Sequence, residues 1–120
     1  MTIEEFFIDY LTDELPPLSL SVPFPVSGSV PHPMPAEFVT VERTGGSESN
    51  LIPTAQIHVQ SWSSSRAAAA ALNATVVAAM LASAGEPEIS SISLTACYNN
   101  PDLATHRPRY SAAFEVVYLI

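Results

Sequence analysis

Hydrophobic and polar residues alternate in several segments of this chain. Apolar residues recur at every second position over 38–44, 54–62, 91–98 and 110–120. Such alternation is typical of half-buried β-strands. The turn-rich segment Asn99–Pro108 separates the last two of these strands, which we therefore expect to pair as antiparallel neighbours.

The N-terminal segment predicts an amphipathic helix followed by a proline-rich arm. Thr2 and Glu5 have the spacing of a capping box, so a helix should begin at about Ile3 and end at the following Pro-Pro pair. Residues 16–37 then contain an alternating segment interrupted by prolines, which we interpret as an edge strand and an extended arm. The arm is either a solvent-exposed loop or a contact with a neighbouring subunit.

A second, longer helix is predicted between Ser63 or Ser64 and Gly85. Its core face has Leu72 and Val76, and no charged residue lies between Arg66 and Glu86. The opposite face is a stripe of small residues: Ala67, Ala71, Ala74, Ala78 and Ala82. A helix that is apolar on all sides is usually buried on all sides. Either the N-terminal helix or a second subunit should cover the alanines.

These elements predict a single domain over residues 1–120. We expect an α+β fold with an antiparallel sheet of four to five strands and two helices packed on one face. Gly45 and Gly46 are expected to form a turn that opens a mobile loop over residues 45–53.

The charge excludes several functions. The net charge is -8, and the four basic residues are all arginine, so the chain has no lysine for a Schiff base or a P-loop. An acidic chain lacks the cationic surface that grips nucleic acid, so DNA is expected only as passing cargo. The acidic N-terminus does not suggest a secretion signal. The alanine-rich helix suits a protein core better than a membrane.

Candidate chemistry is sparse, and we expect no enzyme activity, no metal and no cofactor. The three histidines, His32, His58 and His106, have no second ligand at metal-binding spacing. Cys97 and His58 could share one sheet face, with Glu42 or Asp102 orienting the imidazole. That arrangement would suit a small cysteine-dependent hydrolase. An enzyme of this kind is the alternative hypothesis from a different functional class.

Two stretches and a loop resemble a known family. PAEFVTVERTGG (Pro35–Gly46), AQIHVQSWSSSRAAAAAL (Ala55–Leu72) and NPDLATHRPRY (Asn100–Tyr110) are similar to the tail terminator, or tail completion, proteins of long-tailed phages and prophages. The similarity extends from about Phe6 to the C-terminus. The long proline-rich arm, the SESNLIP insertion and the absence of lysine depart from the family pattern.

The resemblance implies a structural protein of the virion tail, assembled in the host cytoplasm. It would form a homo-hexameric ring that stops polymerisation of the tail tube and contacts the tail-tube protein and head-completion or connector proteins, without a membrane. A head-tail adaptor, a stopper or another minor neck or tail protein is the alternative within this class. Ten residues are predicted to contact subunits or partners: Pro31, Pro33, Pro35, Arg43, Ser47, Glu48, Asn50, Trp62, Arg107 and Arg109.

Overall fold

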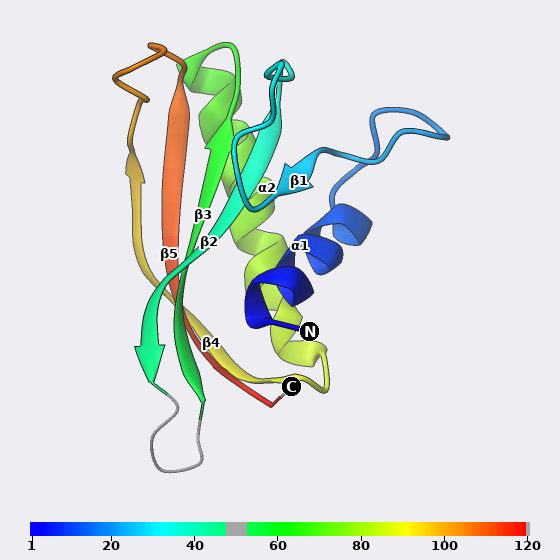
Figure 1. Cartoon of the computed structure of the whole chain (residues 1–120), viewed down its shortest axis with the longest axis vertical. Helices are drawn as coiled ribbons and strands as arrows, with labels where there is room; N and C mark the ends of the chain where they lie inside the picture. The colour runs from blue at the N-terminus through cyan, green and yellow to red at the C-terminus, as the bar shows by residue number, and fades with distance from the viewer. Residues whose placement is uncertain (48–52, 120) are drawn as a thin grey trace.

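The computed structural model is an α+β fold in which a five-stranded sheet carries two helices (Figure 1). The structure describes residues 1–47 and 53–119. The helices are α1 (Ile3–Glu14) and α2 (Arg66–Ala82), and the 3-10 turn η2 (Ser83–Gly85) continues α2. The strands are β1 (Val26–Ser27), β2 (Phe38–Ser47), β3 (Thr54–Trp62), β4 (Ile89–Asn99) and β5 (Arg109–Tyr118).

The sheet is mixed, where a purely antiparallel one was expected. Its strand order is β1-β2-β3-β5-β4, and β1 runs parallel to β2 while the other neighbours are antiparallel. Parallel neighbours need a connection that returns along the strand. The proline-rich arm between Ser27 and Phe38 provides this return, so β1 enters the sheet parallel to β2.

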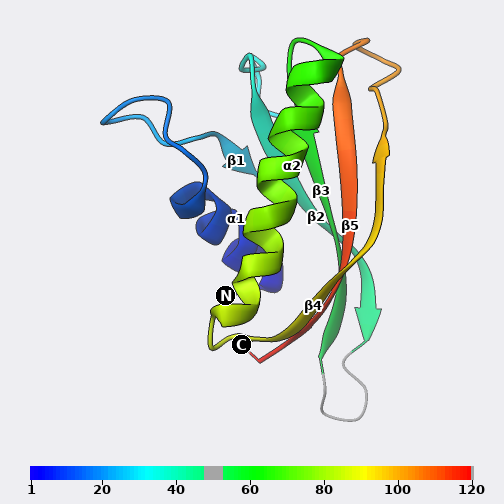
Figure 2. The same ribbon diagram turned by 180° about the vertical axis from the view of Figure 1, so that it is seen from behind.

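Both helices cover the same face of the sheet, as the sequence predicted (Figures 1 and 2). One core cluster contains Phe7 and Leu11 of α1, Val76 and Met80 of α2, and Phe114 of β5. All five of these side chains are fully buried. Burial of aromatic and aliphatic side chains on one sheet face is the main driving force for this two-layer arrangement.

Side chains cap both helices at their N-terminal ends. The backbone N–H of Glu5 donates to Thr2 Oγ1 over 3.1 Å, which confirms the expected capping box position. The second cap is Ser65, one residue beyond the expected Ser63 or Ser64, and its hydroxyl accepts from the N–H of Ala68. Ser63 is instead buried and hydrogen-bonded to Glu37.

The alternating segment from Leu18 to Val26 does not form the expected edge strand. Only Val26–Ser27 pairs with β2, and the Ser19–Val22 bridge closes a tight turn before it. Prolines at positions 23 and 25 cannot donate to a strand ladder, so the segment cannot pair along its length. The turn leaves Leu18, Leu20 and Val22 exposed.

The expected turn at Gly45 and Gly46 is also wrong, because β2 continues through both glycines to Ser47. The β2–β3 register shifts between Arg43 and Gly45, which is a β-bulge rather than a chain reversal. Residues 48–52, including most of the expected mobile loop and the predicted contacts Glu48 and Asn50, lie outside the described residues.

Candidate functional site

The cysteine and histidine of the hydrolase hypothesis lie on opposite faces of the sheet. The β4–β5 register shifts between Leu94 and Ala96, so Cys97 turns to the helix side and accepts a hydrogen bond from Asn73 Nδ2 at 3.0 Å. His58 alternates with the core residues of β3 and faces away from the helices. The bulge breaks the strict alternation on which the pairing of these two residues was based. Cys97 and His58 therefore form no nucleophile and base pair.

Candidate metal ligands do not gather in the described part of the chain either. Within residues 1–47 and 53–119, no group of three or more His, Cys, Asp or Glu side chains is arranged to hold a metal ion. Asp102 has its pKa lowered, first by the hydrogen bond from the Thr105 hydroxyl and also by Arg109, whose Nη1 lies 3.7 Å from its carboxylate. This interaction organises the loop before β5.

Trp62 and Arg109, two of the predicted contact residues, make their contacts within the chain. The Trp62 ring stacks on Phe38 with centroids 5.0 Å apart, and its Nε1 donates to Thr40 Oγ1 at 3.2 Å. The guanidinium of Arg109 lies 4.9 Å from the centroid of the Trp62 ring, a cation–π contact. Trp62 is only 3% exposed, so its side chain offers a partner almost no surface.

Arg107 fixes the end of the proline-rich arm. Its Nη2 donates to the carbonyl oxygens of Pro35 at 3.0 Å and Ala36 at 2.8 Å, and its Nε donates to that of Ser63 at 3.4 Å. The guanidinium also lies 5.9 Å from the centroid of the Phe38 ring. These bonds join the arm to the β3–α2 connection, so the last part of the arm is held on its own chain.

Replacing Arg107 with alanine should lower the free energy of unfolding by about 1.5 to 3 kcal/mol, because hydrogen bonds from a charged donor to partly buried carbonyls are lost. Chemical denaturation measures the loss, and hydrogen exchange at Ala36 locates it. The control is Arg66→Ala, since Arg66 is exposed and forms no hydrogen bond or ion pair with the described residues. Equal stability of the two variants would contradict this role of Arg107.

Arg43 supports the bulge in β2. Its Nε donates to the carbonyl oxygen of Gly45 at 3.1 Å, and its Nη2 donates to that of Thr54 at 3.3 Å. Its Nη1 lies 3.4 Å from the Tyr118 hydroxyl. The three arginines chosen as partner contacts therefore all have partners in their own chain, and intersubunit contact through them stays a prediction.

A second exposed surface lies along β4 and α2. β4 is an edge strand of eleven residues, and all of them after Ile89 except the half-buried Ile92 are exposed. Leu94 and Tyr98 are 39% and 45% exposed. The strand contains no charged residue and no proline, which are the usual protections of an edge.

Helix α2 extends this surface, because its alanine face is uncovered (Figure 2). All five alanines of the predicted stripe are exposed, and α1 lies over the opposite end of the sheet, near β1 and β2. We define the neutral surface as β4 from Ser90 to Asn99 together with the exposed apolar residues of the second half of α2. The latter are Ala74, Ala78, Leu81 and Ala82.

The segment Arg66–Gly85 is also long and apolar enough to cross a membrane by length and composition, which alone is weak evidence. In this chain it packs Ala69, Val76 and Met80 against the sheet. The alanine face was recognised in the sequence, but the β4 part of the neutral surface was missed, because β4 has the alternating pattern of any half-buried strand. The feature of the sequence that could have indicated this surface is the complete lack of charged residues in β4, in a chain of net charge -8.

Comparison with family models and with curated proteins found no relative of this chain.

Proposed function

We propose that this chain is a structural protein of a phage tail. It is a tail terminator that assembles as a ring at the head-proximal end of the tail tube, stops polymerisation of the tube and joins the tail to the head. The resemblance of Pro35–Gly46 and Ala55–Leu72 to that family supports the proposal. The observation that carries it is the neutral surface, which is suited to contact between copies.

Charge explains why copies would meet at this surface. Each copy has a net charge of -8, so most mutual orientations are repulsive. Five of the twelve acidic residues lie on α1, which is remote from β4: Glu4, Glu5, Asp9, Asp13 and Glu14. The neutral surface itself is uncharged, so contact through it brings fewer like charges together than contact through α1. Burial of its exposed leucines and alanines would add a hydrophobic contribution.

Strand directions support a ring rather than a pair. β4 runs opposite to β2, because the order β2-β3-β5-β4 contains three successive antiparallel steps. β1 pairs only with Val39 and Thr40 of β2, and no described strand pairs with the rest of that edge of β2. The β4 edge of one copy can therefore continue antiparallel onto β2 of the next. A head-to-tail contact of this kind closes into a ring when its rotation divides a full turn.

Lysine in place of Ala96 should abolish self-association. Ala96 is exposed on β4, and a lysine on an edge strand opposes pairing with another strand. Light scattering over a concentration series should give a mass near six chains for the natural protein and one chain for Ala96→Lys. The matched control is Ala104→Lys, an exposed alanine in the loop before β5, which should assemble normally.

Two results would count against this interpretation in different ways. A natural protein that remains a single chain, both alone and when mixed with tail-tube protein, would contradict the ring. Rings that form equally well from Ala96→Lys would leave the tail function standing but show that another surface joins the copies.

A further inference from the structure

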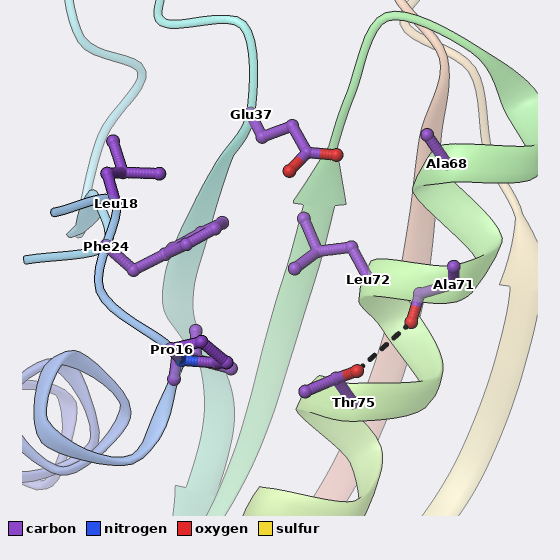
Figure 3. A pocket seen from close by; sticks show the side chains of 9 residues that line it. Pro16, Leu18, Phe24, Glu37, Ala68, Ala71, Leu72 and Thr75 are labelled. Carbon is purple, nitrogen blue, oxygen red and sulfur yellow. Dashed lines mark hydrogen bonds between the residues drawn. The ribbon is translucent and has the colours of Figure 1, made fainter.

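An open cavity lies between the first half of α2 and the segment that follows α1 (Figure 3). Its volume is about 410 Å³, in the range of sites that enclose small ligands or a few side chains. Leu15 and Phe24 line one wall, and Ala68, Ala71 and Leu72 of α2 line the other. Leu15 and Phe24 are 1% and 6% exposed, so this wall is anchored in the core.

Among the described residues that line the cavity, Glu37 is the only charged one. Its carboxylate points into the cavity from the strand side, opposite Ala68 (Figure 3). One oxygen, Oε1, accepts the hydroxyl of Ser63 at 2.9 Å, and Ser63 is fully buried, which fixes the carboxylate in place. No arginine or histidine of the described residues forms an ion pair with Glu37. The cavity thus presents a positioned negative charge that forms no ion pair with the described residues, although Arg107 binds the neighbouring carbonyl of Ala36.

An exposed apolar turn forms the rim. The N–H of Leu18 donates to the carbonyl oxygen of Val22 at 2.9 Å, and the Ser19–Val22 bridge closes the turn. Leu18 also lines the cavity and is 57% exposed, while Leu20 is fully exposed and Val22 is 47% exposed. Apolar residues clustered on a surface beside a cavity are typical of a binding site for another protein.

We propose that this cavity and its rim bind a short segment of another protein in which a lysine or arginine is flanked by apolar residues. The aliphatic part of such a side chain would pack against Phe24 and Leu72, and its charged end would reach Glu37. The flanking residues would cover the apolar turn at Leu18 and Leu20. Glu37 has no ion-pair partner among the described residues, which favours a basic residue in the bound segment, and the apolar walls select its neighbours.

This site goes beyond the proposed ring and does not depend on it. Three of the four arginines in the chain contact their own chain, namely Arg43, Arg107 and Arg109. A second copy could therefore offer only Arg66. The large apolar flanks that the rim requires are absent there, because Ser65 precedes Arg66 and only small alanines follow it. A different protein is the better occupant.

Three peptides test the proposal: acetyl-Leu-Lys-Leu-Leu-amide and its variants with glutamine or glutamate in place of lysine. We expect the lysine peptide to shift the backbone NMR signals of Ala68, Ala71 and Leu72 and to bind at least about tenfold more tightly than the glutamine peptide, as expected for one charge-assisted hydrogen bond. Glu37→Gln should remove this preference. Glutamine keeps an acceptor for the Ser63 hydroxyl, so the fold should be retained.

A second variant fills the cavity from within. Ala71 is exposed, so Ala71→Lys should fold normally, place its own cation near Glu37 and abolish peptide binding. Ala84→Lys, exposed beyond the far end of α2, is the matched control and should bind like the natural chain.

Equal binding of the lysine and glutamine peptides, or no shift of the NMR signals at the cavity, would overturn the proposal. The proposal would also be overturned if the NMR signals of the cavity residues changed when the protein was diluted without peptide, and if this change was lost in Arg66→Ala. The occupant would then be a second copy of the chain. None of these outcomes depends on ring formation, which light scattering measures separately.

Discussion

Replacing Trp62 with alanine should lower the free energy of unfolding by about 3 to 5 kcal/mol, the usual cost of truncating a buried aromatic side chain. Trp62 is 3% exposed and stacks on Phe38 at 5.0 Å. Its removal also takes away the ring beneath the Arg109 guanidinium and the donor to Thr40. Denaturant unfolding followed by circular dichroism measures the change.

Trp62→Phe separates the packing of the ring from its hydrogen bond. Phenylalanine retains an aromatic ring against Phe38 but has no N–H for Thr40, so this variant should lose less stability than alanine. If Trp62→Ala were as stable as the natural chain but no longer formed rings, the side chain would serve an interface, as the sequence originally suggested. The contacts within the chain predict the opposite result.

Gly46→Ala should be the second large effect, with a loss of about 3 kcal/mol or more in the free energy of unfolding. Gly46 has a φ of +137°, a conformation that costs other residues about 1 to 3 kcal/mol. A Cβ there would overlap the carbonyl oxygen of Thr54 and lie 2.8 Å from the Cα of Ala55. Because both neighbours are backbone atoms of β3, relief requires the two strands to separate. Thermal or chemical unfolding measures this loss.

Gly85→Ala is the matched control. A Cβ at Gly85 meets no atom within 4 Å, and its φ lies outside the positive region. This variant should be close to neutral or slightly stabilising, because alanine restricts the unfolded chain more than glycine does. Similar losses at the two glycines would mean that the end of β2 does not have the bulged conformation described above.

The neutral surface and the Glu37 cavity are suited to two different kinds of contact. The neutral surface includes β4 at one edge of the sheet, while the Glu37 cavity lies toward the other edge, between α2 and the segment after α1. A ring that used β4 and the open edge of β2 would leave the cavity to a different protein. The tail terminator role proposed above would use both kinds of contact, with its own copies and with its neighbours in the tail.

Local patterns were sufficient to predict the regular elements. Both helices, the strands β2, β3, β4 and β5 and the α+β class follow from apolar periodicity, from the Thr2 cap and from the Pro-Pro pair after α1. These signals work because each depends on side chains a few residues apart, and the helix or strand period places those side chains on a common face. The absence of lysine and the excess of acidic residues are likewise evident from the sequence alone.

The functional surfaces depended on contacts between distant segments, which periodicity does not encode. Bulges at Gly45 and near Ala96 changed the register of two strands and moved Cys97 to the face opposite His58. The strand order made β4 an edge. Arg107 and Arg109, chosen as partner contacts because cations are scarce, bind carbonyl oxygens of their own chain, which only folding brings within reach. The sequence by itself therefore determined which elements form, and the tertiary structure decided which of their faces remain open to other molecules.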